Sequence, residues 1–379
     1  MDFQLTEEQK IFQNTARDFA KKELEPIAAH IDENEEFPFE NLKKMANLGI
    51  TGLTIDEKYG GAGGSFIHWC IAMEEVAHAC AATATVLDTT MGLAGHCIYK
   101  NGNEEQKSRY VTPLAKGEKI GCFGLTEANA GSDPAGLETT AVKDGNSYVL
   151  NGSKIFISNA NVADILVIFA TKDRSLGYKG MSAFIVEKGT AGLSIGVRYH
   201  KVGIRGAHNA EIILNNCRIP AKNLLGNEGQ GFRIALSTLD GARIGIAALA
   251  VGLARAALEA SISYTKQRQQ YGQPIANFQA IQFVFADMAT KIDAARLLAY
   301  RAADLKDKGL PFTTEAAMAK VFAAEVAMET TTKGIQMHGG YGYMMDSAMQ
   351  RYFRDAKITE IYEGTSEIMR VIISRSLLR

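Results

Sequence analysis

The 379-residue sequence is poor in proline, in tryptophan and in net charge. It has 7 prolines against 36 glycines and a single tryptophan, Trp69, a balance that favours close helix packing and tight turns over flexible linkers. A formal net charge of -1 excludes a protein that binds nucleic acid mainly through bulk positive charge. Because 46% of the residues are hydrophobic and 22% are charged, as in average globular chains, disorder and collagen-like structure are excluded as well.

Paired cysteines and long apolar runs are also missing. The five cysteines form no C-x-x-C pair, so we expect buried thiols in a reducing compartment rather than a zinc site or a disulfide framework. The start of the chain lacks the basic segment and apolar run of a secretory signal. The most apolar stretch, residues 244–254, is shorter than the ~20 residues that cross a bilayer. These features predict a cytoplasmic protein with no integral membrane segment.

The common nucleotide and metal motifs do not occur either. The glycine pairs at 229–231 and 340–342 both lack the last glycine of G-x-G-x-x-G, and there is no G-x-x-x-x-G-K-[ST]. Rossmann dehydrogenases and P-loop enzymes are therefore disfavoured. Since no H-E-x-x-H and no His/Cys cluster is present, we expect no metal site.

The hydrophobic pattern changes period twice, which divides the chain into three segments. Residues 1–121 have helical spacing, residues 122–228 have short alternating runs, and residues 229–379 return to helical spacing. Because no strand is followed by a crossover helix, a doubly wound parallel sheet is disfavoured. The pattern predicts an α+β fold with a helical domain, a β domain and a helical bundle in that order.

Within these segments several elements are predicted individually. Asp144-Gly145 marks a β-hairpin. Largely apolar runs of strand length occur at residues 165–170, 181–186 and 210–214. Helical spacing predicts helices near residues 244–262, 316–328 and 367–378.

Two loops of the middle segment are candidate ligand sites. Residues 126–133 are small or carry hydroxyls and expose backbone N–H groups, which suits a phosphate or carbonyl, although an ordinary polar loop has the same composition. Residues 151–159 form a turn followed by a strand that bears Phe156 and a hydroxyl. The Phe156 ring is either a cofactor wall or a core side chain.

Two features of the last segment have similar alternatives. Arg268, at the end of a long helix, can bind a pyrophosphate in a bidentate manner or can be a solvated helix end. The glycines at 339, 340 and 342 either terminate a helix or let a flat ring approach the backbone closely.

Glu363 is the candidate catalytic residue. It precedes a glycine, and Thr365 or Ser366 can cap the helix that follows. A carboxylate among Ile361, Tyr362 and Ile368 would have a raised pKa and could remove a weakly acidic C–H proton. From the residues alone, a catalytic role and a structural role both remain open.

Taken in order, these segments are similar to the acyl-CoA dehydrogenase family, and within it to the short-chain or butyryl-CoA branch. The resemblance covers the whole chain and rests on LTE at 125–127, AGSD at 130–133, NGSK at 151–154, GIRG at 203–206, TLD at 238–240, RIGIA at 243–247, HGG at 338–340 and ITEIYEGTSE at 358–367. It implies an N-terminal all-α domain (1–121), a middle antiparallel β-barrel-like domain (122–228) and a C-terminal four-helix bundle (229–379). It also implies a homotetramer with one non-covalent FAD in each subunit.

The resemblance assigns site residues by position. Those matching FAD contacts are Phe123, Leu125, Thr126, Phe156, Ser158, Gln336, Gly340, Thr365 and Glu367, with Arg268, Gln270 and Tyr271 reaching a neighbouring subunit's FAD. Those matching positions near the acyl-CoA are Ser132, Leu239, Asp240, Arg243 and Gly364. Phe156 stands where many relatives have tryptophan, and the aromatic wall is retained.

Glu363 matches the family's catalytic base. The family's second position for a base is occupied here by Ala242, which cannot accept a proton. The resemblance implies that Glu363 removes an α-proton while its own N–H and a flavin ribityl hydroxyl polarise the thioester carbonyl. A β-hydride then passes to the flavin, the product is a 2-enoyl-CoA, and the electrons pass to an electron-transfer flavoprotein.

Asp88 is a lone carboxylate in the stretch 76–99, in a helix that borders the acyl end of the family's pocket. It is either a surface or capped aspartate, or a residue that shapes the pocket for an unusual acyl group such as an alicyclic ring. Three functions stay open: a dehydrogenase for a short, branched or alicyclic acyl-CoA, an acyl-CoA oxidase or enoyl-CoA reductase of the same fold, and a CoA-ester-binding protein without turnover.

Overall fold

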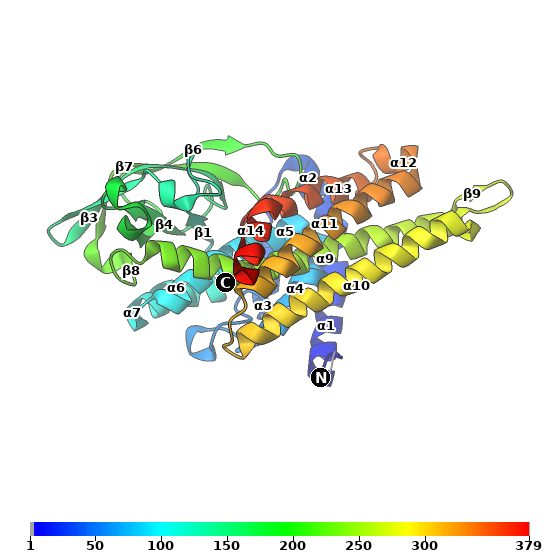
Figure 1. Cartoon of the computed structure of the whole chain (residues 1–379), viewed down its shortest axis with the longest axis horizontal. Helices are drawn as coiled ribbons and strands as arrows, with labels where there is room; N and C mark the ends of the chain where they lie inside the picture. Colours follow the sequence, from blue (N-terminus) through cyan, green and yellow to red (C-terminus); the bar gives the residue numbers. More distant parts are fainter. Residues whose placement is uncertain (1–3, 379) are drawn as a thin grey trace.

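A computed structural model describes residues 4–378 of the chain. Helices form both ends of the sequence and strands form the middle, as Figure 1 shows. The first segment contains α1 (Glu7–Phe19), α2 (Ala28–Asn34), α3 (Phe39–Asn47), α4 (Phe66–Ala79), α5 (Ala81–Leu87), α6 (His96–Asn101), α7 (Glu104–Gln106) and α8 (Thr112–Ala115). A π-helical segment, Asp88–Gly95, continues α5 into α6. The α+β class and the order helical, β, helical are confirmed.

The middle segment is one sheet of eight strands. Its order is β6-β7-β3-β2-β4-β5-β8, with β1 beside β4. The strands are β1 (Gly121–Gly124), β2 (Thr140–Asp144), β3 (Ser147–Ser158), β4 (Ile165–Thr171), β5 (Met181–Glu187), β6 (Leu193–Tyr199), β7 (Asn209–Pro220) and β8 (Leu224–Leu225). The hairpin between β2 and β3 lies where Asp144-Gly145 predicts it. Neighbouring strands are antiparallel except that β4 is parallel to β1 and, at one residue pair, to β2.

Strand β4 explains why the sequence pattern there is apolar without alternation. Its residues are buried on both faces of the sheet. Val167 and Phe169 pack into the core shared with the helices, whereas Leu166 and Ile168 pack into a second core inside the β domain. A strand covered on both faces has no polar side, so its sequence is a continuous apolar run. Strand β4 thus packs the sheet against the helices, and the candidate site lies between these two parts.

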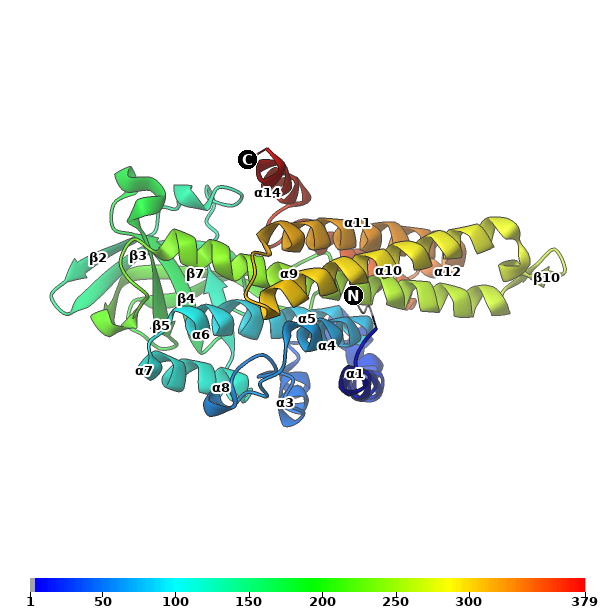
Figure 2. The ribbon, with the colours of Figure 1, turned by 60° about the horizontal axis from the view of Figure 1, so that its bottom comes forward.

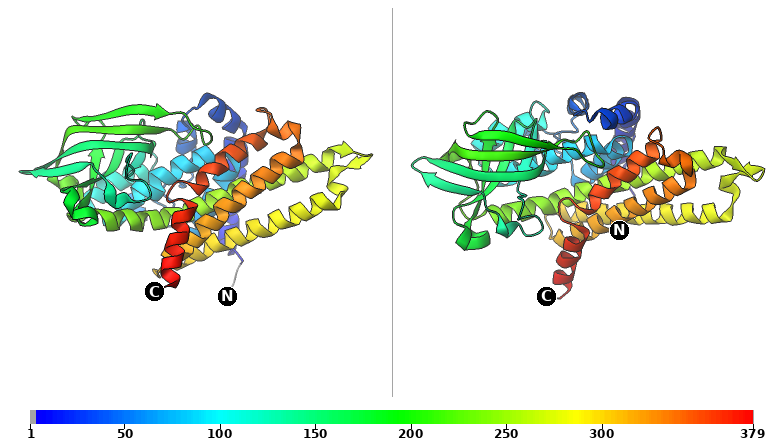
Figure 3. Two further views of the ribbon diagram at one scale, coloured as in Figure 1. Left: turned by 45° about the horizontal axis from the view of Figure 1, so that its top comes forward. Right: turned by 90° about the horizontal axis from the view of Figure 1, so that it is seen from above.

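The last segment is built on three long helices, α9 (Gly231–Gln267), α10 (Gln279–Asp307) and α11 (Thr313–His338). They run side by side along the length of the molecule, and β9 (Gln269–Gln270) and β10 (Gln273–Pro274) form a small hairpin at their far end (Figure 2). Shorter helices follow: α12 (Gly340–Tyr343), α13 (Ala348–Lys357), which packs on α11 and α9, and α14 (Ser366–Leu377). Figure 3 shows α14 leaving the bundle at a steep angle.

Helix α9 is the central helix of the molecule. By length and composition alone it could cross a membrane, because its apolar part is longer than residues 244–254 suggest. In the structure 78% of its most apolar window is buried, so it is a core helix. A Cβ at Gly252 would lie 2.4 Å from the carbonyl oxygen of Glu74, so only glycine allows α9 to approach α4 this closely.

Two elements are longer than the sequence predicts. Helix α11 extends beyond residues 316–328 at both ends, and polar residues in its interior have hydrogen-bond partners. Lys320 donates to the Gly364 carbonyl at 2.7 Å, and Thr331 donates to the Ala327 carbonyl at 2.8 Å. Strand β7 is 12 residues long rather than five because bulges let it follow the whole of β3.

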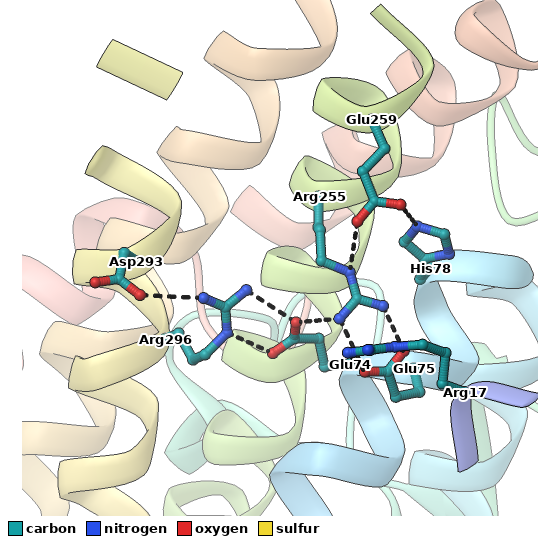
Figure 4. A network of polar contacts seen from close by, with 8 residues as sticks. All are labelled: Arg17, Glu74, Glu75, His78, Arg255, Glu259, Asp293 and Arg296. Carbon is teal, nitrogen blue, oxygen red and sulfur yellow. Dashed lines mark hydrogen bonds and ion pairs between the residues drawn. The ribbon is translucent and has the colours of Figure 1, made fainter. Parts of the chain in front are cut away.

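A buried ionic network ties four helices together (Figure 4). Glu74 and Glu75 of α4 are 2% and 1% exposed. Arg255 of α9 donates to both carboxylates, Arg296 of α10 donates to Glu74, and Arg17 of α1 donates to Glu75. Although burial opposes it, the hydrogen bonds from Arg255 and Arg17 lower the pKa of Glu75. The five cysteines are free and buried, as predicted.

Candidate active site

A cavity of about 640 Å³ lies where the three segments of the chain meet. Its walls come from β1 and β3, from the loop after β1, from α5 and the π-helical segment, from the first half of α9, and from α14 with the loop before it. In Figure 1, α14 lies at the junction of the sheet and the long helices.

The structure brings most of the predicted site residues together in this cavity. Twelve of them line it: Asp88, Phe123, Leu125, Thr126, Ser132, Phe156, Ser158, Leu239, Asp240, Arg243, Glu363 and Gly364. Four others, Arg268, Gln270, Gln336 and Gly340, line a separate hollow of about 530 Å³ near the far end of α9 and α11. Tyr271 stands beside that hollow and is 94% exposed. Thr365 and Glu367 lie at the first turn of α14.

The backbone around Glu363 is held from three sides. The Thr365 side chain caps α14 by accepting from the Ile368 N–H at 3.3 Å. Arg243 of α9 donates its Nε–H to the Glu363 carbonyl at 3.0 Å, and Lys320 of α11 donates to the next carbonyl, that of Gly364. Glu363 itself has φ 55°, a left-handed conformation that is rare for glutamate and that these contacts maintain.

Arg243 is in turn oriented by Asp240, one helical turn earlier. Its Nη1 donates to Asp240 Oδ1 at 2.6 Å, and Asp240 Oδ2 accepts from the Thr313 hydroxyl at 2.7 Å. Arg243 is 3% exposed, so its positive charge acts on the cavity with little screening by solvent.

The Glu363 carboxyl is in a setting that favours its protonated form. Its Oε2 is buried. Burial raises the pKa of Glu363 to about 7, while the Asp88 carboxyl and the cations Arg243 and Lys320 oppose that rise. A carboxyl with a pKa near neutrality can both accept and release a proton at physiological pH.

Asp88 follows the last residue of α5 and is buried rather than at the surface, and its carboxyl makes no capping hydrogen bond. It is 1% exposed and lines the cavity together with Glu363, which overturns the interpretation of it as a surface or capped aspartate. Burial raises the pKa of Asp88 well above its usual range, and the Glu363 charge raises it further, against the opposing charge of Lys306.

Phe156 gives the cavity an aromatic surface. Phe156 is 59% exposed, so it is not a core side chain, and its ring packs on Tyr199 at a centroid distance of 4.9 Å. Asn209 fixes this wall by donating to the Phe156 carbonyl at 2.8 Å and to the Ser158 hydroxyl at 3.2 Å.

A buried ion pair fixes the loop of residues 126–133, which is therefore more than a solvated polar loop. Lys154 is fully buried, and its Nζ lies 2.6 Å from Glu127 and donates to the Leu125 carbonyl at 3.2 Å. Glu127 also accepts from the Thr139 N–H. The cavity wall at Leu125 and Thr126 is thus held rigidly.

Sequence reasoning missed Lys320 and Tyr362 as members of this site. In the sequence Lys320 is one polar residue of a long helix. Its contact with Gly364 could not be predicted, because it depends on how α11 packs against the loop before α14. The Tyr362 hydroxyl is buried, and burial together with the Glu363 charge raises its pKa well above the usual range. Its position next to Glu363 was the only signal available in the sequence.

Family models match nearly the whole chain. The N-terminal domain of acyl-CoA dehydrogenase matches residues 6–118, the middle domain matches residues 122–217, and the C-terminal domain matches residues 229–378. The chain is 50% identical, with full coverage of both proteins, to a short-chain specific acyl-CoA dehydrogenase of Clostridium acetobutylicum. It is 52% identical to an acryloyl-CoA reductase (NADH) of Anaerotignum propionicum, with 100% of this chain and 96% of that protein covered.

Solved structures agree with these matches. Butyryl-CoA dehydrogenase of Megasphaera elsdenii superimposes with a TM-score of 0.98 at 46% identity. A second match, with a TM-score of 0.98 at 48% identity, is a chain in a structure described as electron transferring flavoprotein of Acidaminococcus fermentans. In both comparisons 100% of this chain and 100% of the other chain are covered. The fold and the carboxylate-bearing cavity are those of a flavin-dependent oxidoreductase acting on thioesters. The chain belongs to the acyl-CoA dehydrogenase family, and it is an acyl-CoA dehydrogenase similar to the short-chain specific members.

Proposed function

We propose that the cavity binds the acyl end of a short-chain acyl-CoA and that Glu363 removes the α-proton. The observation that carries this proposal is the Glu363 carboxyl, which lies in the cavity on a backbone fixed by Arg243 and Lys320. A pKa near 7 suits a general base at physiological pH, and such a base contributes roughly 10²–10⁴-fold to a rate. Ala242, at the family's second base position, is buried and carries no proton acceptor.

The remaining cavity residues position the substrate in this proposal. The backbone N–H of Glu363 donates to the thioester carbonyl, which makes the α-proton more acidic. Ser132, Leu239, Asp240, Arg243 and Gly364 hold the thioester and the CoA chain. Asp88 borders the acyl group. Rates with butyryl-CoA, branched acyl-CoA and cyclohexanecarbonyl-CoA in the presence of an artificial electron acceptor would define the acyl preference.

The residues of the aromatic wall fit an FAD. A flat ring requires an exposed apolar face with hydroxyls at its edge, and Phe156 presents such a face next to Thr126 and Ser158. Phe123 and Leu125 complete the wall in this proposal, and Thr365 and Glu367 add contacts. A flavin bound there supplies the acceptor for the β-hydride.

We infer that the hollow near the far end of the bundle completes the FAD site of another subunit. Arg268, Gln270, Gln336 and Gly340 line it. Arg268 lies with its guanidinium 5.8 Å from the Tyr341 ring centre, and Tyr271 is almost fully exposed, so both are available to a second copy of the chain. Sedimentation of the FAD-loaded protein as a homotetramer would support this assembly, and a monomer that holds FAD fully would contradict it.

The proposed electron acceptor is an electron-transfer flavoprotein, and the proposed location is the cytoplasm. A structure whose description names an electron transferring flavoprotein contains a chain that is 48% identical to this one, which supports the first proposal. The relative named acryloyl-CoA reductase favours a second candidate direction, reduction of an enoyl-CoA. Mixing the oxidised protein with acyl-CoA without oxygen would measure the dehydrogenation rate, and mixing the reduced protein with enoyl-CoA would measure the reverse rate. Peroxide formation matched to turnover would instead indicate an oxidase.

The test of the base is Glu363→Gln. We expect the variant to keep its FAD but to lose the anaerobic bleaching of the flavin by butyryl-CoA. The matched control is Glu360→Gln, because Glu360 lies three residues earlier and pairs with Lys357 at 2.6 Å outside the cavity. Full bleaching by Glu363→Gln would refute the assignment, and absence of bleaching in the unaltered protein would favour a CoA-ester-binding protein without turnover.

A further inference from the structure

Asp88 occupies a niche that two glycines leave open. A Cβ at Gly92, one turn later on the same segment, would lie 2.3 Å from Asp88 Oδ1, and a Cβ at Gly245 of α9 would lie 2.5 Å from it. The same Cβ at Gly245 would lie 2.8 Å from Trp69 Nε1 of α4. Any other residue at Gly92 or Gly245 would displace the carboxyl, so elements far apart in the sequence are both shaped around Asp88.

The carboxyl of Glu363 lines the same cavity as Asp88, and both side chains have buried oxygens without a partner in the described part of the chain. Among residues 4–378, no side chain or backbone group forms a well-aligned hydrogen bond with either oxygen of Asp88 or with Oε2 of Glu363. Both side chains line the same cavity, and each is close enough to change the pKa of the other through its charge or its proton. Two ionised carboxylates in such contact repel strongly, so one of the two keeps a proton at neutral pH.

The surrounding charges decide which carboxyl is ionised. Arg243 of α9 and Lys320 of α11 both stabilise a negative charge on Glu363. Among the residues that the structure describes, the cation acting on Asp88 is Lys306 of α10. Its Nζ lies 3.5 Å from the centre of the Phe66 ring, and burial lowers its pKa to about 7. The Tyr362 hydroxyl is the remaining titratable group at the pair, and it stays neutral.

We propose that Asp88 is a positioning residue for Glu363: the two carboxyl groups share one proton, which Asp88 holds and donates in a hydrogen bond to the Glu363 carboxylate. This inference rests on the proposed role of Glu363 as the base. The hydrogen bond keeps Glu363 ionised although it is buried, and it turns the carboxylate toward one direction in the cavity. After Glu363 has taken the substrate proton, both carboxyls are neutral.

The experiment compares two substitutions of Asp88 in the FAD-loaded protein. Asp88→Asn keeps a donor of the same shape, whereas Asp88→Val removes the donor with an apolar side chain of comparable size. The rate of anaerobic bleaching by butyryl-CoA is measured from about pH 5.5 to 9. We expect the rising limb of the Val profile to move up by about one pH unit or more, with a roughly tenfold slower rate at pH 6, and the Asn profile to lie near that of the unaltered protein.

The control is Asp355→Asn, because Asp355 is also a buried carboxyl but accepts from the Ile204 N–H outside the cavity. Its profile should not move. Equal shifts for Asn and Val, or no shift for either, would overturn the inference while leaving Glu363 as the base. Bleaching by Glu363→Gln would instead overturn the base itself.

A second measurement covers the case in which Asp88→Val does not fold. Folded Asp88 keeps a proton that the unfolded chain releases above about pH 4, so the unaltered protein loses stability as pH rises, and Asp88→Asn lacks this part of the loss. The melting temperature of Asp88→Asn relative to the unaltered protein should therefore increase from pH 4 to 7. A constant difference would overturn the inference.

Discussion

Replacing Glu363 by glutamine should change the pH dependence of stability as well as activity. The folded pKa of about 7 lies above the ordinary glutamate pKa of 4.5, so between these pH values the folded protein holds a proton that the unfolded chain has released. The stability of the unaltered protein therefore decreases as pH rises through this window, and the proton no longer contributes above about pH 7. At 1.36 kcal/mol per pKa unit, the loss is about 3 kcal/mol.

Glutamine has no proton to lose, so Glu363→Gln should gain about 3 kcal/mol relative to the unaltered protein between pH 4.5 and 7. The assay is urea unfolding at a series of pH values, at fixed protein and FAD concentrations. The control is Glu367→Gln on the same segment. Its backbone N–H and the Thr365 hydroxyl lower the pKa of Glu367, so that variant should lose relative stability as pH rises from strongly acid values. A stability difference for Glu363→Gln that stays constant with pH would refute the buried, protonated state.

Two further predictions concern other parts of the molecule. Phe156→Ala should weaken flavin binding about tenfold in titrations. It should change the free energy of unfolding of the flavin-free protein by less than about 0.5 kcal/mol, because the ring is 59% exposed. A flavin affinity equal to that of the unaltered protein would contradict the proposed wall. Glu75→Gln should destabilise the protein by about 1–3 kcal/mol in urea unfolding, because Arg17 loses its charged partner and Arg255 keeps only Glu74 as a buried counter-charge in the network. Asp304→Asn, in the exposed pair with Lys308, should cost less than about 1 kcal/mol, and equal effects would show that the network in Figure 4 contributes no more than a surface pair.

The fold could be predicted from the sequence because its elements have strong periodic patterns. The helical stripe along α9 and the apolar runs of β4 and β5 lie where their spacing predicts them. The length of β7 could not be predicted, because bulges extend its pairing with β3. The extension of α11 contains polar residues such as Thr331, whose hydroxyl is satisfied by the helix's own Ala327 carbonyl. The domain limits at residues 121 and 228 stay a prediction.

The site divides in the same way. Glu363 could be proposed as the base because its local signals, a glycine and a helix cap after an apolar segment, lie within five residues and because this segment resembles that of the family. The environment of Asp88 could not be found, since its partner carboxyl is 275 positions away and the glycine that makes room for it is on another helix. Only the packing of α9 against the π-helical segment distinguishes a pocket carboxyl from a surface one.

Glu363 combines features that each oppose folding. Its backbone is in a left-handed conformation that costs a non-glycine residue of order 1–3 kcal/mol, and its carboxyl is buried beside a second carboxyl. Arg243, Lys320 and the Thr365 cap each bind the backbone of this segment rather than the carboxyl oxygens. Because the backbone carries the support, the carboxylate itself keeps its oxygens free for a proton. A site that held Glu363 by its carboxyl in a close ion pair would be more stable and would lower its pKa, and it would therefore be a weaker base.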